Sequence, residues 1–237
     1  MGVYKTTTNP ASEFGAYTEY ATVLDNGQFW SFAIDNTYGI NYSTMQVGTL
    51  TASGSTYASS NTEIYLLGTH QPPVVETLSG VSFSAPTFSD TVGTSVFGTA
   101  YVYNQSGTAL TYSATDSHTV YDNPLALSTL AGTYVGSSYG VTTSAGNVIE
   151  PMTSFSIASD GTYTGVTATC TYAGKLTQHG KTGVFDQTMT GTGSSCAFSG
   201  AMQGIMIPIA VSSSPQLVFQ MVNSANNLGV WFVVTKS

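Results

Sequence analysis

The chain has 237 residues, of which only 7% are charged, and its four lysines leave a formal charge of −8 at pH 7. Without a basic patch to neutralise phosphates, nucleic acids and anionic membranes are poor partners. The 67 serines and threonines and the 25 glycines favour short strands joined by turns and disfavour helices.

The first half of the chain is predicted to be a series of strands. Residues 20–24 and 29–34 alternate apolar and polar side chains around Asn26-Gly27, a hairpin signal that favours a type I′ turn. Trp30 and Phe32 share one face, which we expect to be the core face. Further strands are expected at 48–50, 63–67, 81–84, 95–103 and 109–114, with a loop over 53–61.

The stretch 121–134 is the one segment whose sequence favours a helix. Asn123 suits an N-cap, Pro124 the first helical position, and Gly132 a left-handed residue just past the end. Leucines 125, 127 and 130 would supply the apolar face. We expect this short helix to be the hinge between two halves of the chain.

The second half repeats features of the first. Gly132-Thr133-Tyr134 echoes Gly2-Val3-Tyr4, Asp160-Gly161 echoes Asn26-Gly27, and Gly174-Lys175-Leu176 echoes Gly48-Thr49-Leu50. Because the three matches stay in order, with offsets of 130, 134 and 126 residues, they indicate a diverged duplication. Strands are expected at 154–158, 162–172, 182–189, 195–199, 205–211, 217–222 and 229–235.

The two cysteines predict one structural disulfide. Cys170 and Cys196 lie in phase with apolar residues of their strands, without metal-ligand spacing. The bridge would close a loop of about 26 residues, worth roughly 3.5 kcal/mol on the chain-entropy model. A disulfide indicates a compartment outside the cytoplasm. No secretory signal or transmembrane run is present, which is typical of a chain whose targeting segment has been removed.

These patterns predict an all-β protein. We expect two tandem antiparallel domains, each a β-barrel or a β-sandwich, joined by a short helical turn. The N-terminal domain is predicted to span residues 1–122, and the C-terminal domain, which contains the Cys170–Cys196 disulfide, residues 123–237.

The catalytic motifs in the sequence lack the structural context that their chemistry requires. Residues 136–140 match the G-x-S-x-G nucleophile elbow, but the elbow needs a strand-to-helix turn, and these residues lie between strands. Glycoside hydrolysis needs two facing carboxylates. Of the glutamates at 13, 19, 63, 76 and 150, only Glu63 is placed on a strand, so no facing pair is predicted. We therefore expect no catalytic residue and no cofactor.

Two other kinds of site are weighed. Asp116, His118 and Asp122 could bind calcium weakly, but a polar loop before the helix is the favoured interpretation, so no metal site is predicted. Exposed aromatic side chains could stack on sugars, although tyrosine is also common in strands. The candidates are tyrosines 17, 20, 38, 42, 57 and 139, whereas Trp30 and Trp231 are expected to be buried.

Four runs carry a resemblance to a known group of proteins. They are Leu24–Trp30, Tyr121–Tyr134, Ser159–Gly165 with Cys170, and Cys196 with Ser199-Gly200. They resemble uncharacterised exported proteins and lipoproteins of Gram-negative bacteria, of surface-antigen type. The resemblance implies a location in the cell envelope and a precursor that could carry an outer-membrane lipid anchor. In plan, two tandem β-domains are more distantly similar to factor H-binding and transferrin-binding lipoproteins.

The sequence therefore predicts a non-enzymatic exported protein, in the periplasm or at the bacterial cell surface, that binds an unknown protein or glycan partner. The alternative is a carbohydrate-active module that binds glycans or, less favoured, hydrolyses them. Such a module needs a row of exposed aromatic side chains. A third hypothesis, an adhesin or appendage subunit, predicts an open sheet edge.

Overall fold

The computed structural model describes residues 2–5, 17–35, 39–54, 56–67, 74–84, 87–92, 95–97, 101–103, 109–113, 120–142, 146–210 and 215–237. The chain divides into two compact units, 1–118 and 119–237. The domain boundary predicted at 122 lies four residues beyond this division. Nearly all described residues are in strands, so the prediction of an all-β, two-domain fold is confirmed.

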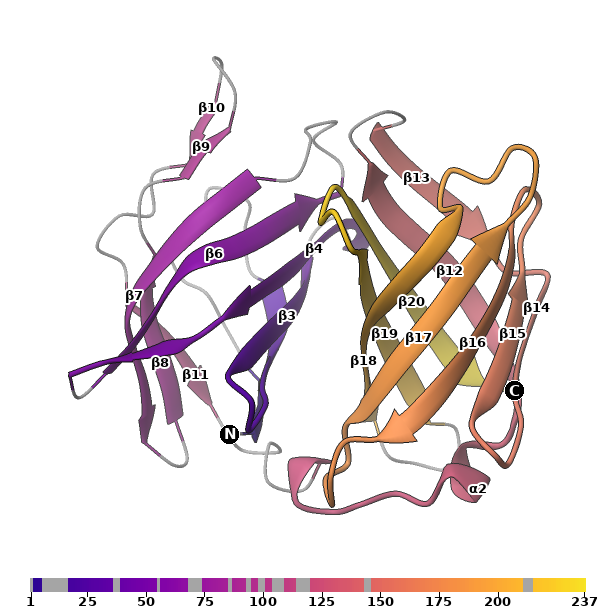
Figure 1. The fold of residues 1–237 in the computed structure, drawn as a ribbon, viewed down its shortest axis with the longest axis horizontal. Coiled ribbons are helices and arrows are strands. Elements are labelled where there is room, and N and C mark those ends of the chain that lie inside the picture. Colours follow the sequence, from indigo (N-terminus) through magenta and orange to yellow (C-terminus); the bar gives the residue numbers. More distant parts are fainter. Residues whose placement is uncertain are drawn as a thin grey trace. The chain divides into compact units, whose positions relative to one another are not determined.

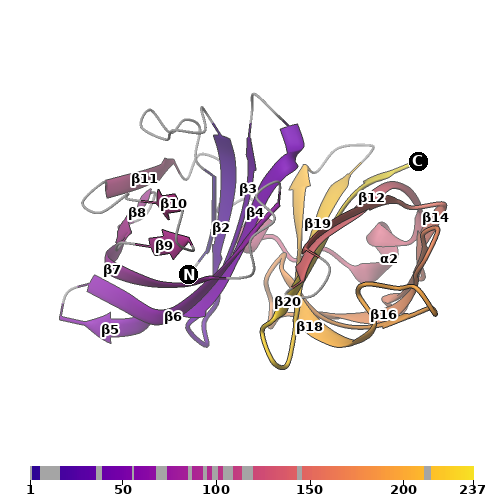
Figure 2. The same cartoon turned by 90° about the horizontal axis from the view of Figure 1, so that it is seen from above.

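The second unit is a closed barrel of eight antiparallel strands (Figures 1 and 2). The barrel runs in the order β12-β14-β15-β16-β17-β18-β19-β20 and closes where β20 pairs with β12, while β13 pairs with the second half of β12 on the same side as β14. The strands are β12 (Gly132–Thr142), β13 (Gly146–Pro151), β14 (Ser154–Ile157), β15 (Thr162–Val166), β16 (Thr171–Gln178), β17 (Phe185–Thr192), β18 (Gly200–Ala210), β19 (Gln216–Asn223) and β20 (Leu228–Lys236).

Aromatic side chains fill the interior of this barrel. Alternate residues of each strand point inward, and the rings of Tyr134, Phe155, Tyr163, Phe219 and Phe232 contact one another, with centroids 5.2–6.1 Å apart. All five side chains are buried. The barrel is therefore a packed core, in contrast to larger barrels that enclose a ligand.

The helix at the start of the second unit is shorter than predicted. α2 spans only Leu127–Leu130, its N-cap is Ala126, and Asn123 and Pro124 lie before it. Gly132 follows the C-cap Ala131 and has a positive φ of +145°, as predicted for the residue just past the helix, and it also begins β12. One turn is too short to be stable alone. The leucines at 125, 127 and 130 join the barrel core instead, and α2 covers one end of the barrel (Figure 2).

The first unit is a nine-stranded sheet in the order β4-β3-β2-β1-β11-β8-β7-β6-β5, in which β4 also pairs with β6. A separate hairpin of β9 and β10 accompanies it. The strands are β1 (Gly2–Lys5), β2 (Tyr17–Val23), β3 (Gln28–Asp35), β4 (Gly39–Thr49), β5 (Thr51–Ser53), β6 (Thr56–Leu66), β7 (Val74–Ser84), β8 (Thr87–Val92), β9 (Ser95–Phe97), β10 (Tyr101–Tyr103) and β11 (Ala109–Ser113).

Two predictions about the strands of the first unit are wrong. The loop expected over 53–61 is largely strand, since β6 begins at Thr56; serine and threonine suit exposed strands as well as loops. The single strand expected over 95–103 is two short strands. The two strands, β9 and β10, pair antiparallel, with Phe97 opposite Tyr101.

The hairpin at Asn26-Gly27 forms as predicted between β2 and β3, but its turn type differs. Gly27 has φ +83°, whereas Asn26 is not in the left-handed region. The Gly27 amide donates to the Leu24 carbonyl and the Leu24 amide to the Gln28 carbonyl. This pattern is a three-residue loop with a glycine bulge, the alternative to a type I′ turn.

The repeat predicted from the sequence is also found in the hydrogen bonds at the hairpin turns, which are the same in the two units. At the second hairpin the Gly161 amide donates to the Ala158 carbonyl, and Gly161 has φ +84°. Each turn glycine also accepts a bond from the repeated leucine: Leu50 to Gly27, and Leu176 to Gly161. The registers correspond too, for example Phe29↔Gly48 in the first unit and Tyr163↔Gly174 in the second. The strands β1–β4 and β12, β14, β15 and β16 are therefore equivalent elements.

Candidate functional site

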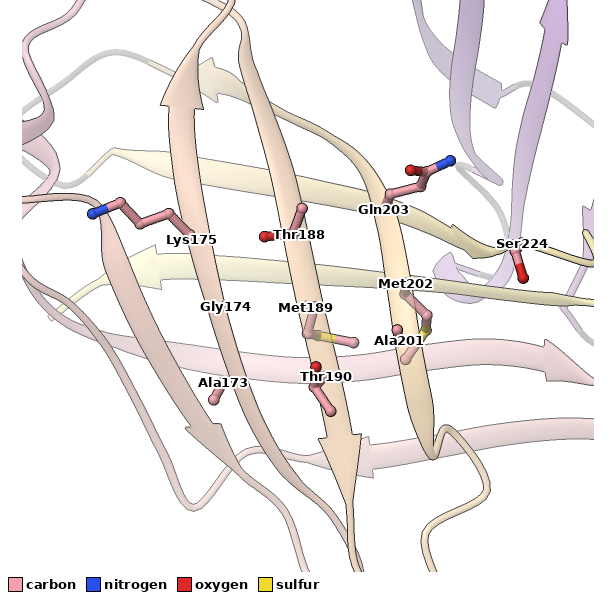
Figure 3. Close-up of a pocket in the computed structure, with 10 residues that line it drawn as sticks. All are labelled: Ala173, Gly174, Lys175, Thr188, Met189, Thr190, Ala201, Met202, Gln203 and Ser224. Carbon is pink, nitrogen blue, oxygen red and sulfur yellow. The ribbon is translucent and has the colours of Figure 1, made fainter.

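The barrel of the second unit has a shallow hollow of about 530 Å³ on its outer face, over β16, β17 and β18 (Figure 3). Cross-strand pairing places Ala173 beside Thr190 and Thr190 beside Ala201, so three residues far apart in the sequence form one row. The full lining is Ala173, Gly174, Lys175, Thr188, Met189, Thr190, Ala201, Met202, Gln203 and Ser224. It contains no aromatic and no carboxylate side chain.

Hydroxyl and amide groups surround this hollow, with one cation at its side. Lys175 lies at one end and Gln203 and Ser224 at the other (Figure 3). The Lys175 ammonium pairs with Asp160 at 3.3 Å, and both groups are exposed. Hydrogen bonds from the Thr162 hydroxyl and amide, with a smaller effect of Lys175, lower the pKa of Asp160 to about 2. The hollow therefore suits a neutral, polar contact surface.

The fold itself does not require this hollow. By the register of the duplication, the positions of Ala173 and Thr190 in the hollow correspond in the first unit to Val47 and Glu63. The same strand positions thus accept large side chains. The hollow therefore results from the short side chains at these positions of the second unit. The barrel architecture itself does not produce it.

A second group of polar side chains lies at the end of the barrel next to the disulfide. Glu150 of β13 accepts hydrogen bonds from the hydroxyls of Thr167 and Thr169, the latter at 2.5 Å. The Thr167 hydroxyl also accepts a bond from the Cys170 amide at 3.0 Å. Glu150 thereby fixes the turn that carries Cys170. Both carboxylate oxygens of Glu150 accept these hydrogen bonds, so Glu150 has a structural role and neither oxygen faces a second carboxylate.

The predicted disulfide is present. Cys170 and Cys196 are bonded, with their Cα atoms 4.8 Å apart, and both residues are buried. The bond joins the β15–β16 turn to the β17–β18 loop. The disulfide predicted from the sequence is therefore confirmed.

The structure corrects the placement of the glutamates. Glu19, Glu76 and Glu150 lie on β2, β7 and β13, so Glu63 is not alone on a strand, and Glu13 lies outside the described residues. The sequence does not predict these strands because apolar and polar residues do not alternate regularly around the three glutamates. Glu19 accepts a hydrogen bond from the Ser31 hydroxyl, and Glu63 accepts one from the Tyr65 hydroxyl at 2.8 Å. The Glu19 carboxylate thus links β2 to β3, whereas Glu63 and Tyr65 both lie on β6.

The G-x-S-x-G match does not form an elbow. Residues 136–140 lie within β12, and Ser138 is buried. A His–Asp pair that the sequence did not suggest occurs at the β16–β17 turn, where His179 Nδ1 is 2.9 Å from Asp186 Oδ1. His179 is buried and Asp186 is exposed. The pair closes a hairpin across six intervening residues, so no local sequence signal marks it.

The aromatic candidates do not form a row on the described surface. Trp30 and Trp231 are buried, as predicted. Tyr139 is also buried and stacks on Trp231, with centroids 6.5 Å apart. Tyr57 is exposed and Tyr20 half-buried, while the side chains of tyrosines 17, 38 and 42 lie outside the described set.

The candidate calcium ligands cannot be placed together, since Asp116 and His118 lie outside the described residues. Within the described part of the chain, no three His, Cys, Asp or Glu side chains gather as metal ligands would. Among the described helices, none has the length and apolarity to span a membrane. Comparison of the chain with models of protein families, with curated proteins and with solved structures found no match.

Buried tyrosines of the barrel give a pH-dependent prediction. Burial raises the pKa of Tyr134 and Tyr172 from 10 to about 12, although hydroxyls near Tyr172 act in the opposite direction. The unfolded chain loses these protons near pH 10, so stability present below pH 10 falls as the pH rises to 12. Burial also raises the pKa of Tyr65, Tyr139 and Tyr163, so tyrosinate absorbance during alkaline titration should show a group of tyrosines, Tyr134 and Tyr172 among them, that ionise together with unfolding. Ionisation of all tyrosines near pH 10 in the folded protein would contradict this.

Proposed function

We propose that the protein is a non-enzymatic, exported protein of the bacterial cell envelope that binds a protein partner through the hollow over β16, β17 and β18. The observation that carries the proposal is the row of short, uncharged side chains that Ala173, Thr190 and Ala201 form in this hollow on rigid paired strands. A rigid, preorganised surface loses little entropy on binding. Because aromatic rings fill the barrel interior, the outer face is the place for a partner.

The proposed location outside the cytoplasm has three supports. The disulfide persists in oxidising compartments such as the periplasm or the cell surface. The surface is poor in charge and rich in serine and threonine. The resemblance to exported proteins and lipoproteins of Gram-negative bacteria points the same way. Anchoring through a lipid on the precursor, and a role as a surface antigen, stay predictions of that resemblance.

A protein partner is favoured over a glycan. Sugar-binding surfaces use exposed aromatic rings, but the lining has none, and the rings of Tyr139 and Trp231 are buried. A partner side chain could enter the hollow and hydrogen-bond to Thr188, Thr190 or Gln203. The carbohydrate-active alternative would need the tyrosines at 17, 38 and 42 to supply its aromatic row.

The test fills the hollow with a large side chain. Ala201→Arg and Thr190→Arg are expected to weaken capture of the bound partner from serum proteins roughly tenfold or more. Val135→Arg is the matched control, since Val135 is an outward-facing residue of β12 that is 61% exposed and lies outside the hollow. Binding on a glycan array with no protein capture would favour the carbohydrate module. Equal loss in all three variants would exclude the hollow as the site.

A further inference from the structure

The sheet of the second unit has one edge that no described strand covers. The barrel closes between β12 and β20, and the strand order ends at β13. β13 pairs with the half of β12 that lies away from α2, from Ser137↔Pro151 to Thr142↔Gly146 (Figure 1). The barrel therefore does not need β13 for closure, and the other side of β13 faces away from the ladder.

The hydrogen-bond pattern shows which groups point to that side. The Met152 amide donates to the Gly136 carbonyl at 2.9 Å. Bonded and non-bonded pairs alternate in an antiparallel ladder. The amides of Glu150 and Val148 therefore point to β12, and the amide of Ile149 between them points away. The N–H and C=O of Ile149 are thus on the open side. Pro151 occupies the same phase, where its missing N–H costs no bond to β12.

The open side of β13 is held in place before any partner arrives. Glu150 is bound by Thr167 and Thr169, and the Ser138 hydroxyl donates to the Glu150 carbonyl at 3.3 Å. Val148 packs against the barrel core, whereas Ile149 is 44% exposed. A fixed edge reduces the entropy lost on strand pairing.

We propose that β13 is a docking edge for an extended segment of another protein, which pairs with the sheet at Ile149. The outward N–H and C=O of Ile149 fit the backbone of an extended polypeptide. Of the usual protections of an edge, β13 carries no lysine, and Pro151 removes a donor only at its last residue. A β-branched residue opposite Ile149 gives the best cross-strand contact. This edge is separate from the hollow and goes beyond the proposed function.

A second copy of the chain is the less suitable occupant. A six-residue strand is only about 20 Å long. Pairing of two such edges on convex barrels buries far less than the roughly 1,200 Å² of a stable complex. A flexible peptide can follow the edge and add side-chain contacts on both faces. The chain's charge of −8 favours a neutral or basic segment.

The test uses the full chain and a synthetic probe. The probe is a peptide of alternating threonine and valine with a lysine at each end, titrated into the ¹⁵N-labelled protein. We expect the amide signal of Ile149 to shift and its hydrogen exchange to slow. The same peptide with alternate amides N-methylated cannot pair as a strand and should produce neither change. Equal effects of both peptides would overturn the proposal.

Variants separate edge pairing from other binding. Ile149→Pro removes the outward donor without removing a bond to β12, so peptide affinity should fall roughly tenfold. Ile149→Val keeps the donor and is the matched control. Ala201→Arg, in the hollow, should leave peptide binding unchanged, so the two sites can fail separately. Peptide shifts confined to the hollow, or an Ile149-dependent dimer in sedimentation, would overturn the proposal.

Discussion

Replacing both cysteines with alanine is expected to lower the free energy of unfolding of the second unit by about 3.5 kcal/mol. The bond between Cys170 and Cys196 closes a loop of 26 residues and restricts the unfolded chain. The loss is a large fraction of the 5–15 kcal/mol typical of a domain. Urea unfolding would be followed through Trp231, the tryptophan of the second unit, in a Trp30→Phe background.

The control for the cysteine variant is the first unit. Unfolding reported by Trp30 in a Trp231→Phe background should be unaffected by loss of the disulfide. Reduction of the unaltered cysteines should destabilise the second unit as the alanine variant does, because both lose the same cross-link. If the variant unfolded at the same urea concentration as the parent, the disulfide would contribute nothing to the free energy of unfolding, against this prediction.

Local sequence signals predicted the fold class well. Alternation of apolar and polar residues located β2 and β3, and turn glycines 27 and 161 marked the two hairpins. The disulfide is predicted from two cysteines assigned to apolar strand faces, although Cys170 and Cys196 lie in the connections between strands. Each of these signals lies within a few residues, so it can be recognised before the chain folds.

Features that depend on packing were missed or misplaced. Helix ends were set from cap residues, but α2 is only one turn and is held by the burial of Leu130. The row of Ala173, Thr190 and Ala201 exists only because β16, β17 and β18 pair in one register. The open side of β13 likewise depends on β20 pairing with β12 rather than with β13. Strand register is set by the whole barrel, so neither site could be predicted from the sequence.

The duplication gives these features a common explanation. Turn geometry and register are the same in both units, and they depend on glycines and backbone bonds. The residues at equivalent positions differ, as with Val47 and Ala173. The scaffold was thus kept while the outer faces diverged. This is the pattern expected when binding surfaces are placed on a shared fold.

The packed interior of the barrel centres on Phe219. Its ring centroid lies 5.3 Å from Phe155, 5.2 Å from Tyr163 and 5.9 Å from Phe232, and its side chain is fully buried. The three neighbours come from β14, β15 and β20, so one side chain joins strands from opposite walls of the barrel. Removing it leaves a cavity that several backbones would have to move to fill.

Phe219→Ala is therefore expected to lower the free energy of unfolding of the second unit by about 3–5 kcal/mol. Phe219→Leu, which keeps part of the volume, should cost less. Val135→Ala, on the exposed outer face, should change stability by no more than about 0.5 kcal/mol. The measurement is urea unfolding reported by Trp231 in the Trp30→Phe background. A cost for Phe219→Ala as small as that for Val135→Ala would mean that the interior is loosely packed and open to a ligand.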